Sequence, residues 1–567
     1  MSDNRSVTIA CASAFWGDTP LAVQQLLRED DLDFIVFDYL SEVTLALLAR
    51  AKKKDPSTGF IGDFLTDVVE PHLAEIQRRK IRLVSNAGGL NPVAMKARIE
   101  EWAASKNIPI RVACVTGDDV QQNSELLPPG LSGRTLSANA YLGAPAIVEA
   151  LNEGADLVIL GRTVDTALAV GPLVHAFGWS WKDFDKLSQA SLAGHIIECG
   201  TQATGGNFTD WESVPKKEDV GFPIIRCFED GSFFVTKPND TGGIVSKASV
   251  AEQITYETGD PSAYLLPDVT CDWSEVKLEE LEPNRVMVIG ARGRAPVDRY
   301  KAIATHQEGF KVSTTAFIAG GDARAKARSI GQAILARCAN AIIARGQPRY
   351  SEVNLEVLGG DDEALLRISA AHPDPSVLEI LAKEIAPAAT SLAPGMTNLL
   401  GGRASVVPRV AMTSFFIPKR ALPVRVVMGG AVKDVDVPGE SSAPVEKVRR
   451  EPPTLLKLRG KRKLSEVAYA RSGDKGNHVN IGVIARNPED FILLQSYLTE
   501  ERLIRYFEKY FDGEPEVEIW DWPGLNAVNI LLKNCLGGGG AYSLRIDPQG
   551  KSYAQRLLEM EISEGKR

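Results

Sequence analysis

The chain has few histidines and no paired cysteines, and both shortages exclude common kinds of site. Its six histidines and the lack of a His-Glu-x-x-His motif argue against a histidine-rich metal centre. Its seven cysteines are odd in number, scattered, and free of Cys-x-x-Cys spacing. They predict reduced thiols, with neither a disulfide framework nor a zinc knuckle.

Excess positive charge and long apolar runs are also missing. The formal net charge is -9 and the isoelectric point is about 5.5, so we expect no nucleic-acid partner. No apolar run approaches the roughly 18 residues of a membrane span, so we expect no membrane partner. The N-terminus passes from polar residues directly into a strand, without the pattern of a signal or transit peptide. These features predict a soluble cytoplasmic protein.

Several catalytic signatures are absent. There is no Gly-x-x-x-x-Gly-Lys-Ser/Thr, no Gly-x-Gly-x-x-Gly after the first strand, and no Gly-x-Ser-x-Gly. Their absence weighs against a P-loop nucleotidase, a dinucleotide-binding enzyme and an α/β hydrolase.

The length and texture of the chain predict two domains. A chain of 567 residues exceeds the roughly 250 to 300 residues that one core supports. Between 432 and 463 the sequence loses periodicity and holds four prolines among many charges. We therefore predict a large domain over 1–431, a linker over 432–463 and a small domain over 464–567.

The large domain begins as an α/β protein. Strands expected at 7–13, 33–39, 81–89, 110–119 and 156–165 alternate with helix-period segments, which predicts a doubly wound, mostly parallel sheet. From Gly194 an α+β extension follows, with a hairpin turn at Asp230-Gly231 and a helix over 322–345 that begins with an Asp cap.

The small domain is expected to be an α+β module of the ferredoxin-like kind. Strands at 464–470 and 479–485 are separated by a charged, glycine-containing loop. A helix, two further strands and a terminal helix follow.

Polar residues follow every predicted strand of the parallel sheet. Ligands of open α/β sheets bind beyond the carboxyl ends of the strands, so these residues are candidates for a site. The alternative is that they are helix N-caps. The candidates taken from these ends are Asp38, Asn86, Asp118, Arg162 and Asp165.

The strand-end carboxylates could also bind a hard cation. Their spacing is not diagnostic, and we assign no residue as a metal ligand. His195 is a further catalytic candidate, because it lies next to a glycine-rich polar segment where a base is useful. His195, Glu198 and Cys199 would share one helix face, although a helix end with a buried cysteine explains the same pattern.

The segment between the first two strands of the small domain is a candidate anion-binding loop. Glycines free the backbone, and the basic side chains supply charge. An ordinary turn is the alternative. A second open question is whether its anion belongs to a substrate or to carboxylates of the large domain. The candidate cofactor-binding residues are Arg471, Ser472, Gly473, Asp474, Lys475, Gly476 and Asn477. Other glycine clusters, such as 537–540, are candidates for anion nests or plain turns.

Several long segments, in order, resemble one family. They are "SNAGGLNP", "ECGTQATGGNF", "KPNDTGG", "APGMTNLLGGR" and "ARSGDKGNHVNIGVIAR" with "LGGGG". The chain resembles the acyclic terpene utilisation AtuA family, with an AtuA domain to about residue 430 and an AtuA-like ferredoxin-fold domain after it. The resemblance implies a setting of isoprenoid and branched acyl-CoA catabolism, beside acyl-CoA carboxylases, enoyl-CoA hydratases and lyases. It carries over no catalytic residues.

We therefore expect an enzyme acting on an acyl-CoA or related carboxylate by hydration, dehydration or C–C cleavage next to a carbonyl. The base is expected among Asp38, Asp118, Asp165 and His195, with Asn86 and Arg162 as polar orienters. Two alternatives remain: a non-catalytic subunit of an acyl-CoA carboxylase pathway, and a lyase or cyclase of natural-product biosynthesis. No cofactor is predicted, a coenzyme A thioester is the candidate substrate, and we expect a homo-oligomer.

Overall fold

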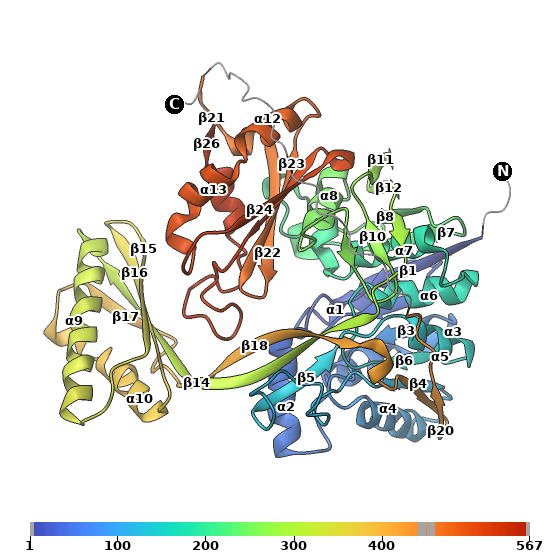
Figure 1. The fold of residues 1–567 in the computed structure, drawn as a ribbon, viewed down its shortest axis with the longest axis horizontal. Coiled ribbons are helices and arrows are strands. Elements are labelled where there is room, and N and C mark those ends of the chain that lie inside the picture. The colour runs from blue at the N-terminus through green and yellow to red at the C-terminus, as the bar shows by residue number, and fades with distance from the viewer. Residues whose placement is uncertain (1–4, 440–449, 451–459, 563–567) are drawn as a thin grey trace.

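The structure is a computed structural model in which residues 5–439, 450 and 460–562 are described. Figure 1 shows an N-terminal domain, an arm at the left that projects from it, and a C-terminal domain at the top. Most of the predicted linker, 432–463, lies outside the described residues, so the domain boundaries stay a prediction. In the described part of the chain, no helix combines the length and the apolar character needed to cross a membrane.

An eleven-stranded sheet forms the middle of the N-terminal domain. Its five central strands are mutually parallel. In spatial order they are β1 (Ser6–Cys11), β2 (Phe34–Phe37), β3 (Arg82–Ser85), β6 (Leu157–Ile159) and β4 (Val112–Thr116). Each is a short apolar run that is largely buried on both faces, as expected for parallel strands covered by helices. The five strands predicted in this region are confirmed, although each is shorter than predicted.

Six more strands flank these five, and all of them pair antiparallel. They are β7 (Ile224–Phe228), β8 (Phe233–Thr236), β12 (Arg285–Ile289) and β11 (Lys277–Glu282) on one side, and β19 (Arg425–Met428) and β20 (Ala431–Asp434) on the other. The sheet is therefore mixed: the strands predicted to be parallel are parallel, but segments from the predicted α+β extension join the same sheet, which as a whole is not mostly parallel. A tight turn explains the antiparallel pairing of β7 with β8, because strands joined by a turn as short as Asp230-Gly231 can only run antiparallel.

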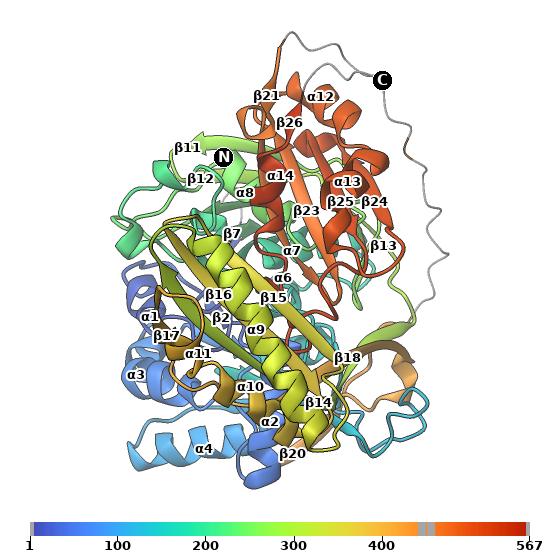
Figure 2. The same ribbon diagram turned by 90° about the vertical axis from the view of Figure 1, so that its left-hand side faces the viewer.

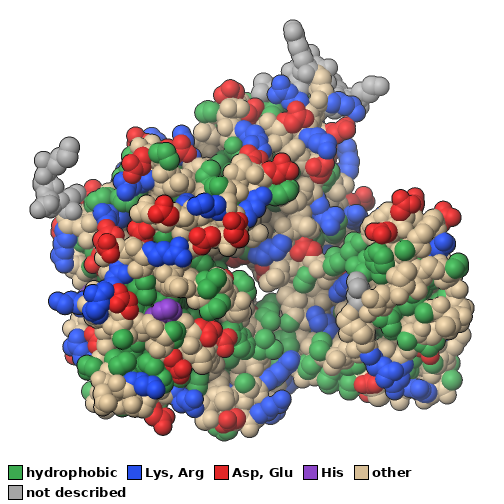
Figure 3. All heavy atoms as spheres, turned by 180° about the vertical axis from the view of Figure 1, so that it is seen from behind, with side chains coloured by type: hydrophobic (Ala, Val, Ile, Leu, Met, Phe, Trp, Pro, Cys, Tyr) green, Lys and Arg blue, Asp and Glu red, His purple; other side chains and the backbone are tan. Residues whose placement is uncertain are grey.

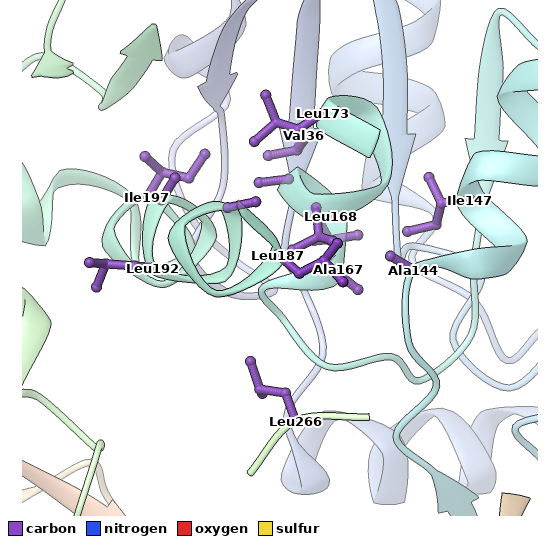
Figure 4. Close-up of a cluster of buried hydrophobic side chains, with 14 of the residues drawn as sticks. Val36, Ala144, Ile147, Ala167, Leu168, Leu173, Leu187, Leu192, Ile197 and Leu266 are labelled. Carbon is purple, nitrogen blue, oxygen red and sulfur yellow. The ribbon is translucent and has the colours of Figure 1, made fainter. Parts of the chain in front are cut away.

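Helices cover both faces of this sheet. One face packs against α1 (Leu21–Leu26), α2 (Glu42–Lys54), α3 (Glu70–Arg78) and α4 (Pro92–Ser105). The other packs against α5 (Pro145–Asn152), α6 (Ala167–Phe177) and α7 (Phe184–Ile197). In the second cluster, Leu168 of α6 and Leu187 of α7 lie close together, and Val36 of β2 lies beside Leu173 of α6 (Figure 4). The two helix layers and the hydrogen bonds between strands fix the position of each strand. They thereby also fix the position of the residues that directly follow the strands.

The arm comprises residues 310–406 and is reached through one very long strand, β14 (Arg299–Ala319). The first part of β14 pairs with β5 (Thr135–Ala140) and β18 (Val407–Pro418), and the second part pairs with strands of the arm. The arm consists of α9 (Ala323–Ala344), β15 (Glu352–Gly359), β16 (Glu363–His372), α10 (Pro375–Glu384), α11 (Ala388–Ser391) and β17 (Met396–Leu400). It has a hydrophobic core of its own, and Figure 2 shows α9 lying across its sheet.

Helix α9 confirms the helix predicted at 322–345, but the predicted Asp cap was wrong. Asp322 has a left-handed backbone, with φ 62°, and its side chain makes no capping hydrogen bond. A capping side chain reaches the first amides from an extended backbone, which Asp322 does not have.

The C-terminal domain has a four-stranded antiparallel sheet in the order β22–β23–β25–β24. Its elements are β22 (Ala468–Lys475), β23 (His478–Ala485), α12 (Asp490–Tyr497), α13 (Glu500–Phe507), β24 (Val517–Trp522), β25 (Ala527–Leu532) and α14 (Tyr553–Leu558). The predicted loop between the first two strands was wrong, because the ladder continues until Lys475 lies opposite His478. Only Gly476 and Asn477 form the turn, and the positive φ of Gly476, 66°, suits such a tight hairpin.

Helix α8 (Lys247–Thr255) of the N-terminal domain packs against β22 and β23, so the two domains lie in contact. Its N-terminus is fixed by a capping box between Ser246 and Ser249. Figure 3 shows, from behind, that the surface is hollowed near its centre, between the C-terminal domain and the arm.

Candidate functional site

The ends of β2 and β3 meet through two predicted site residues. Asp38 follows β2 and Asn86 follows β3, and both side chains are buried. Asn86 Nδ2 donates to Asp38 Oδ1 at 2.7 Å, and Asn86 Oδ1 accepts from the Tyr39 amide at 2.8 Å. Asn86 therefore fixes the orientation of the Asp38 carboxyl, and its predicted role as an orienter in catalysis stays a prediction.

Asp118, after β4, braces the segment that follows β6. Its Oδ2 accepts from the Arg162 amide and from Asn139 Nδ2, both at 2.8 Å. Burial raises the pKa of Asp118 to about 6, and these two hydrogen bonds oppose the shift. A Cβ atom at Gly161 would lie 2.6 Å from Asp118 Oδ2, which explains the glycine there. Asn139 thus holds the Asp118 carboxyl, which in turn fixes the backbone of Arg162.

Three carboxyl groups converge at this edge of the sheet: Asp38, Asp165 and Glu198, which we call the carboxyl cluster. One oxygen from each lies within 4.8 Å of the others. Asp165 follows β6, and Glu198 follows the last residue of α7. Arg162 Nη1 donates to Asp165 Oδ1 at 2.8 Å and to the Leu40 carbonyl at 2.7 Å. The strand ends and a helix end therefore place three acids beside one guanidinium.

Burial and mutual repulsion favour the protonated forms of two of these acids. Burial, and then the charge of Asp165, raises the pKa of Asp38 well above its usual range. Burial, and then the charges of Asp165 and Glu257, does the same to the pKa of Glu198. Such a group can hold a proton near neutral pH, as a general acid requires.

His195 supports this cluster from α7. Its ring is buried, with Nδ1 3.1 Å from Glu198 Oε1 and Nε2 3.3 Å from the Ile254 carbonyl. Burial, and then the charge of Lys475, lowers the pKa of His195 to about 4, so the ring is neutral at physiological pH. The hydrogen-bond pattern assigns the proton to Nε2, leaving Nδ1 to accept from a protonated Glu198. His195 is thereby suited to positioning Glu198.

The tip of the β22–β23 hairpin completes the site from the other domain. Lys475 Nζ lies 5.7 Å from the centre of the Tyr264 ring, and its charge acts on Glu198 and His195. Burial, and then the charge of Glu257, raises the pKa of Asp474 to about 7. Of the seven residues predicted at this tip, Lys475 therefore lies near the carboxyl cluster, whereas Asp474 lies near Glu257.

The other residues of the tip have structural contacts. Arg471 pairs with buried Glu252 at 3.0 Å. Its remaining contacts are with Gln253 Oε1 at 3.0 Å and with two backbone carbonyls of the N-terminal domain. Ser472 bonds to the backbone of 550 and 554. The anion next to Arg471 is thus a carboxylate of the N-terminal domain. The predicted role of Arg471 in binding a phosphate group stays a prediction, which these contacts do not support.

Glycine and asparagine at the tip shape the hairpin. A Cβ atom on Gly473 would lie 2.5 Å from the Tyr256 ring, so glycine allows close contact between the domains. Gly476 forms the turn. Asn477 Oδ1 accepts from the amides of Leu536 and Gly538, at 3.3 and 2.7 Å.

The glycine cluster at 537–540 also turns its amides inward. Gly537 donates to Asp512, Gly538 to Asn477, and the next two glycines to backbone carbonyls. None of these four amides is left for an anion nest. Their positive φ angles show that the segment is a tight structural turn.

Several residues of the site were not predicted from the sequence. Glu42 begins α2 and bonds to the Tyr141 hydroxyl, and the Tyr141 ring lies 4.1 Å from the Arg162 guanidinium carbon. Lys301 on β14 lies 5.2 Å from the same ring. Glu198 was noted for its spacing from His195 and not assigned a role. No local sequence pattern indicated Tyr141 and Lys301, because only the long-range pairing of β5 with β14 brings them to the site.

The carboxyl cluster could also hold a divalent cation. Its three oxygens are hard ligands of the type that Mg²⁺ and Ca²⁺ prefer. Of the strand-end acids considered for such a site, Asp38 and Asp165 belong to the cluster, whereas Asp118 is held by Arg162 and Asn139.

Comparison with known families matches nearly the whole chain. The sequence model of the acyclic terpene utilisation family protein AtuA matches residues 7–428. The model of the AtuA ferredoxin-like domain matches residues 462–563. No curated protein matches the chain. The site described above draws on both matched regions, and the chain belongs to the AtuA family of acyclic terpene utilisation proteins.

Proposed function

We propose that the protein is a lyase that acts on a branched or isoprenoid acyl thioester, or on the related carboxylate. Its reaction would be the addition or removal of water, or the cleavage of a C–C bond, next to a carbonyl group. Family membership supports the isoprenoid setting. The observation that carries the chemistry is the carboxyl cluster, in which two acids that favour the protonated form adjoin a third that is paired with Arg162.

The cluster supplies an acid and a base side by side. Asp165, paired with Arg162, offers a negatively charged oxygen that can take a proton from the carbon next to the carbonyl. Glu198 in its protonated form can give a proton to the departing hydroxyl, which leaves as water while the double bond forms. In the cleavage reaction, a base of the same cluster takes the proton of a hydroxyl, the C–C bond breaks, and the acid protonates the new carbanion.

The surroundings of the cluster suit these steps. The Asp165 side chain is 33% exposed and that of Glu198 is 12% exposed, so a substrate can reach one from solvent while the other stays sheltered. His195 and Asn86 hold the two raised-pKa acids in place. The Arg162 guanidinium adds positive charge where an oxyanion would develop.

Turnover by purified protein tests this proposal. A panel of branched acyl-CoA thioesters and their free acids would be incubated with the wild type, Glu198→Gln and Asp165→Asn, and products would be followed by mass spectrometry. We expect turnover of at least one compound, with a loss of roughly 100- to 10,000-fold in each variant. Glu501→Gln is the matched control, because Glu501 is 81% exposed and remote from the cluster.

Two results would contradict the proposal. One is turnover that is unchanged in both cluster variants. The other is a lack of turnover for every compound, together with isolation of the protein in complex with another subunit, which would favour an accessory role.

A further inference from the structure

We infer that the arm is a hinged clamp that closes on the C-terminal domain beside the carboxyl cluster. It grips residues 536–546 of that domain, which we call the strap and which lie between the arm and the tip of the β22–β23 hairpin. When the arm turns outward, the strap is released and the hollow between the arm and the C-terminal domain widens (Figure 3). The inference concerns movement of the arm and does not depend on the reaction proposed above.

The two strands that carry the arm, β14 and β18, are both interrupted at one level, which we call the hinge. The register between them shifts between Gln307 and Phe310, so β14 has a β-bulge there. Within the bulge, Gly309 has a φ of 72°, a left-handed backbone that favours glycine. Opposite Phe310, β18 has Pro408, which has no amide to donate to its neighbour. A bulge bends a strand and a missing hydrogen bond weakens the pair, so the connection can flex at the hinge.

The neighbouring strands do not stiffen the hinge. β5 pairs with β14 only as far as His306, and β16 pairs with it only from Phe310 onward. β17 joins further along, at 315–318. Among the described residues, β18 is therefore the only strand that pairs with β14 on both sides of the bulge. The arm can turn about the hinge without breaking the other strand pairs.

The arm can turn as a single body because it has a hydrophobic core of its own. Helices α9 and α10 pack on its sheet, and their buried side chains, such as Ile334 and Leu378, belong to one cluster. The buried side chains of the C-terminal domain, such as Leu494 and Phe507, form another. In the part of the chain that the structure describes, the two clusters share no residue, so separation of the arm from the C-terminal domain leaves both cores intact.

Four side chains of the arm bond to the backbone of the strap. They are Lys311 of β14, Arg367 of β16, and Asn354 and Glu356 of β15, with distances from 2.6 to 3.3 Å. The two cations, Lys311 and Arg367, donate to the carbonyls of Ser543 and Leu544. Water replaces each of these bonds on opening, so the net strength of each is modest. Contacts of this kind hold the arm closed and can still be broken.

A further contact lies beside the hinge and can persist when the arm turns. Arg409 follows Pro408, and its guanidinium carbon is 3.5 Å from the centre of the Tyr542 ring. Its Nε donates to the Tyr542 carbonyl at 2.9 Å. The Arg409 side chain is only 6% exposed. A contact so close to the hinge moves little, whereas the contacts of β15 and β16 lie further out and separate.

The strap also contacts the turn of the β22–β23 hairpin. Asn477 Oδ1 accepts from the strap amides of Leu536 and Gly538. A Cβ atom on Gly539 would lie 2.2 Å from the Gly476 carbonyl oxygen, so the strap and the turn lie in direct contact. The arm and the hairpin turn therefore hold opposite ends of one short segment.

Lys475, the residue before this turn, connects it to the carboxyl cluster. Lys475 Nζ lies 5.7 Å from the centre of the Tyr264 ring, which is 6.0 Å from the centre of the His195 ring. His195 Nδ1 lies 3.1 Å from Glu198 Oε1. Contacts therefore run from the arm, through the strap and the hairpin tip, to the cluster.

Distances between spin labels test the movement directly. One pair of labels is placed at Ile343→Cys on α9 and Arg505→Cys on α13, where the native side chains are 52% and 75% exposed. Cys199→Ser removes the one native cysteine that is not buried. Pulsed EPR would compare this protein with a clamp variant that also carries Lys311→Met and Arg367→Met. We expect one short distance to dominate before the change. The clamp variant should raise the ratio of long to short distances at least tenfold, for the loss of two charged hydrogen bonds.

Controls separate turning of the arm from other changes. Lys383→Met removes a cation of the arm that is 60% exposed and pairs with Glu379, and it should leave the distances unchanged. A second pair of labels, at Val93→Cys on α4 and Arg505→Cys, should keep its distance in the clamp variant, because the N- and C-terminal domains stay in contact. Hydrogen–deuterium exchange, followed by mass spectrometry, should be faster in the strap and unchanged in α9.

Four results would overturn the inference. One is that the arm pair gives the same distances in both proteins. Another is faster exchange in the strap while those distances stay the same, because the strap then frays alone. A third is that the α4 pair lengthens as much as the arm pair, because the domains then separate. The last is a longer distance that appears only with a loss of protection in α9, because the arm then unfolds.

Discussion

Replacing Arg471 should destabilise the protein strongly, because its partner Glu252 is fully buried. The Glu252 side chain has 0% exposure, that of Arg471 has 4%, and the charged atoms are 3.0 Å apart. Removal of one partner from a buried ion pair costs about 3 to 5 kcal/mol, since the other charge is left without compensation. We therefore expect Arg471→Ala to lower the free energy of unfolding by about that amount, which is a large part of a typical total stability.

The pH dependence of this loss follows from the causes of the Glu252 pKa. Burial raises this pKa, and the charge of Arg471 is the largest influence that lowers it. Without Arg471 the folded-state pKa rises further above the unfolded value of about 4.3. A carboxyl with a raised pKa destabilises the fold progressively as pH rises from the unfolded pKa through the folded pKa. The loss in Arg471→Ala should therefore be larger at pH 8 than at pH 5.

Urea unfolding at both pH values, followed by circular dichroism, measures this effect. Arg505→Ala is the control, because Arg505 is 75% exposed and its ion pair with Glu501 should contribute less than about 1 kcal/mol. The double variant Arg471→Met with Glu252→Leu should recover part of the loss, since no buried charge remains. The reasoning is refuted if Arg471→Ala unfolds like the wild type and instead loses coenzyme A binding, as a phosphate grip would.

Three further predictions concern a buried acid, a glycine between the domains and the cysteines. Burial raises the pKa of Asp118 to about 6, so its ionisation destabilises the folded wild type as pH rises from about 4 to about 7. Asp118→Asn lacks this loss and should gain stability relative to the wild type over that range, by at most about 3 kcal/mol. Parallel pH–stability curves of the two proteins would contradict this. Gly473→Ala should cost about 1 to 3 kcal/mol in urea unfolding, because its Cβ would meet the Tyr256 ring at 2.5 Å, whereas Gly62→Ala has free space and should be nearly neutral. Six of the seven cysteines are buried, so the folded protein should react with a thiol reagent at pH 8 at least tenfold more slowly than the unfolded chain, and equal rates would argue against this core.

The strand ends show what the sequence can predict about such a site. Asp38, Asn86 and Arg162 each follow a short apolar run, and parallel strands place their carboxyl ends at one edge of a sheet. Local patterns therefore suffice to bring these residues together. Their individual roles were less predictable, because Asp118 also follows a strand and yet braces Arg162.

The remaining parts of the site depend on contacts between distant segments. Glu198 reaches the strand ends only because α7 packs on the sheet and ends there. Lys301 comes from a strand whose partner, β5, lies more than 150 residues earlier. Lys475 comes from the other domain, where the sequence predicted a loop and the structure has a hairpin. No local pattern encodes such contacts, since they arise from tertiary packing.

Exchange of a substrate proton with solvent tests the central claim most directly. The claim is that the carboxyl cluster moves a proton at the carbon next to a carbonyl. In D₂O, mass spectrometry of a compound that the protein turns over, or of its product, should show deuterium at that carbon. The wild type and Glu501→Gln should incorporate it, whereas Asp165→Asn should do so at least 100-fold more slowly. Hydration or C–C cleavage without incorporation, or incorporation that is equal in the wild type and Asp165→Asn, would contradict the account.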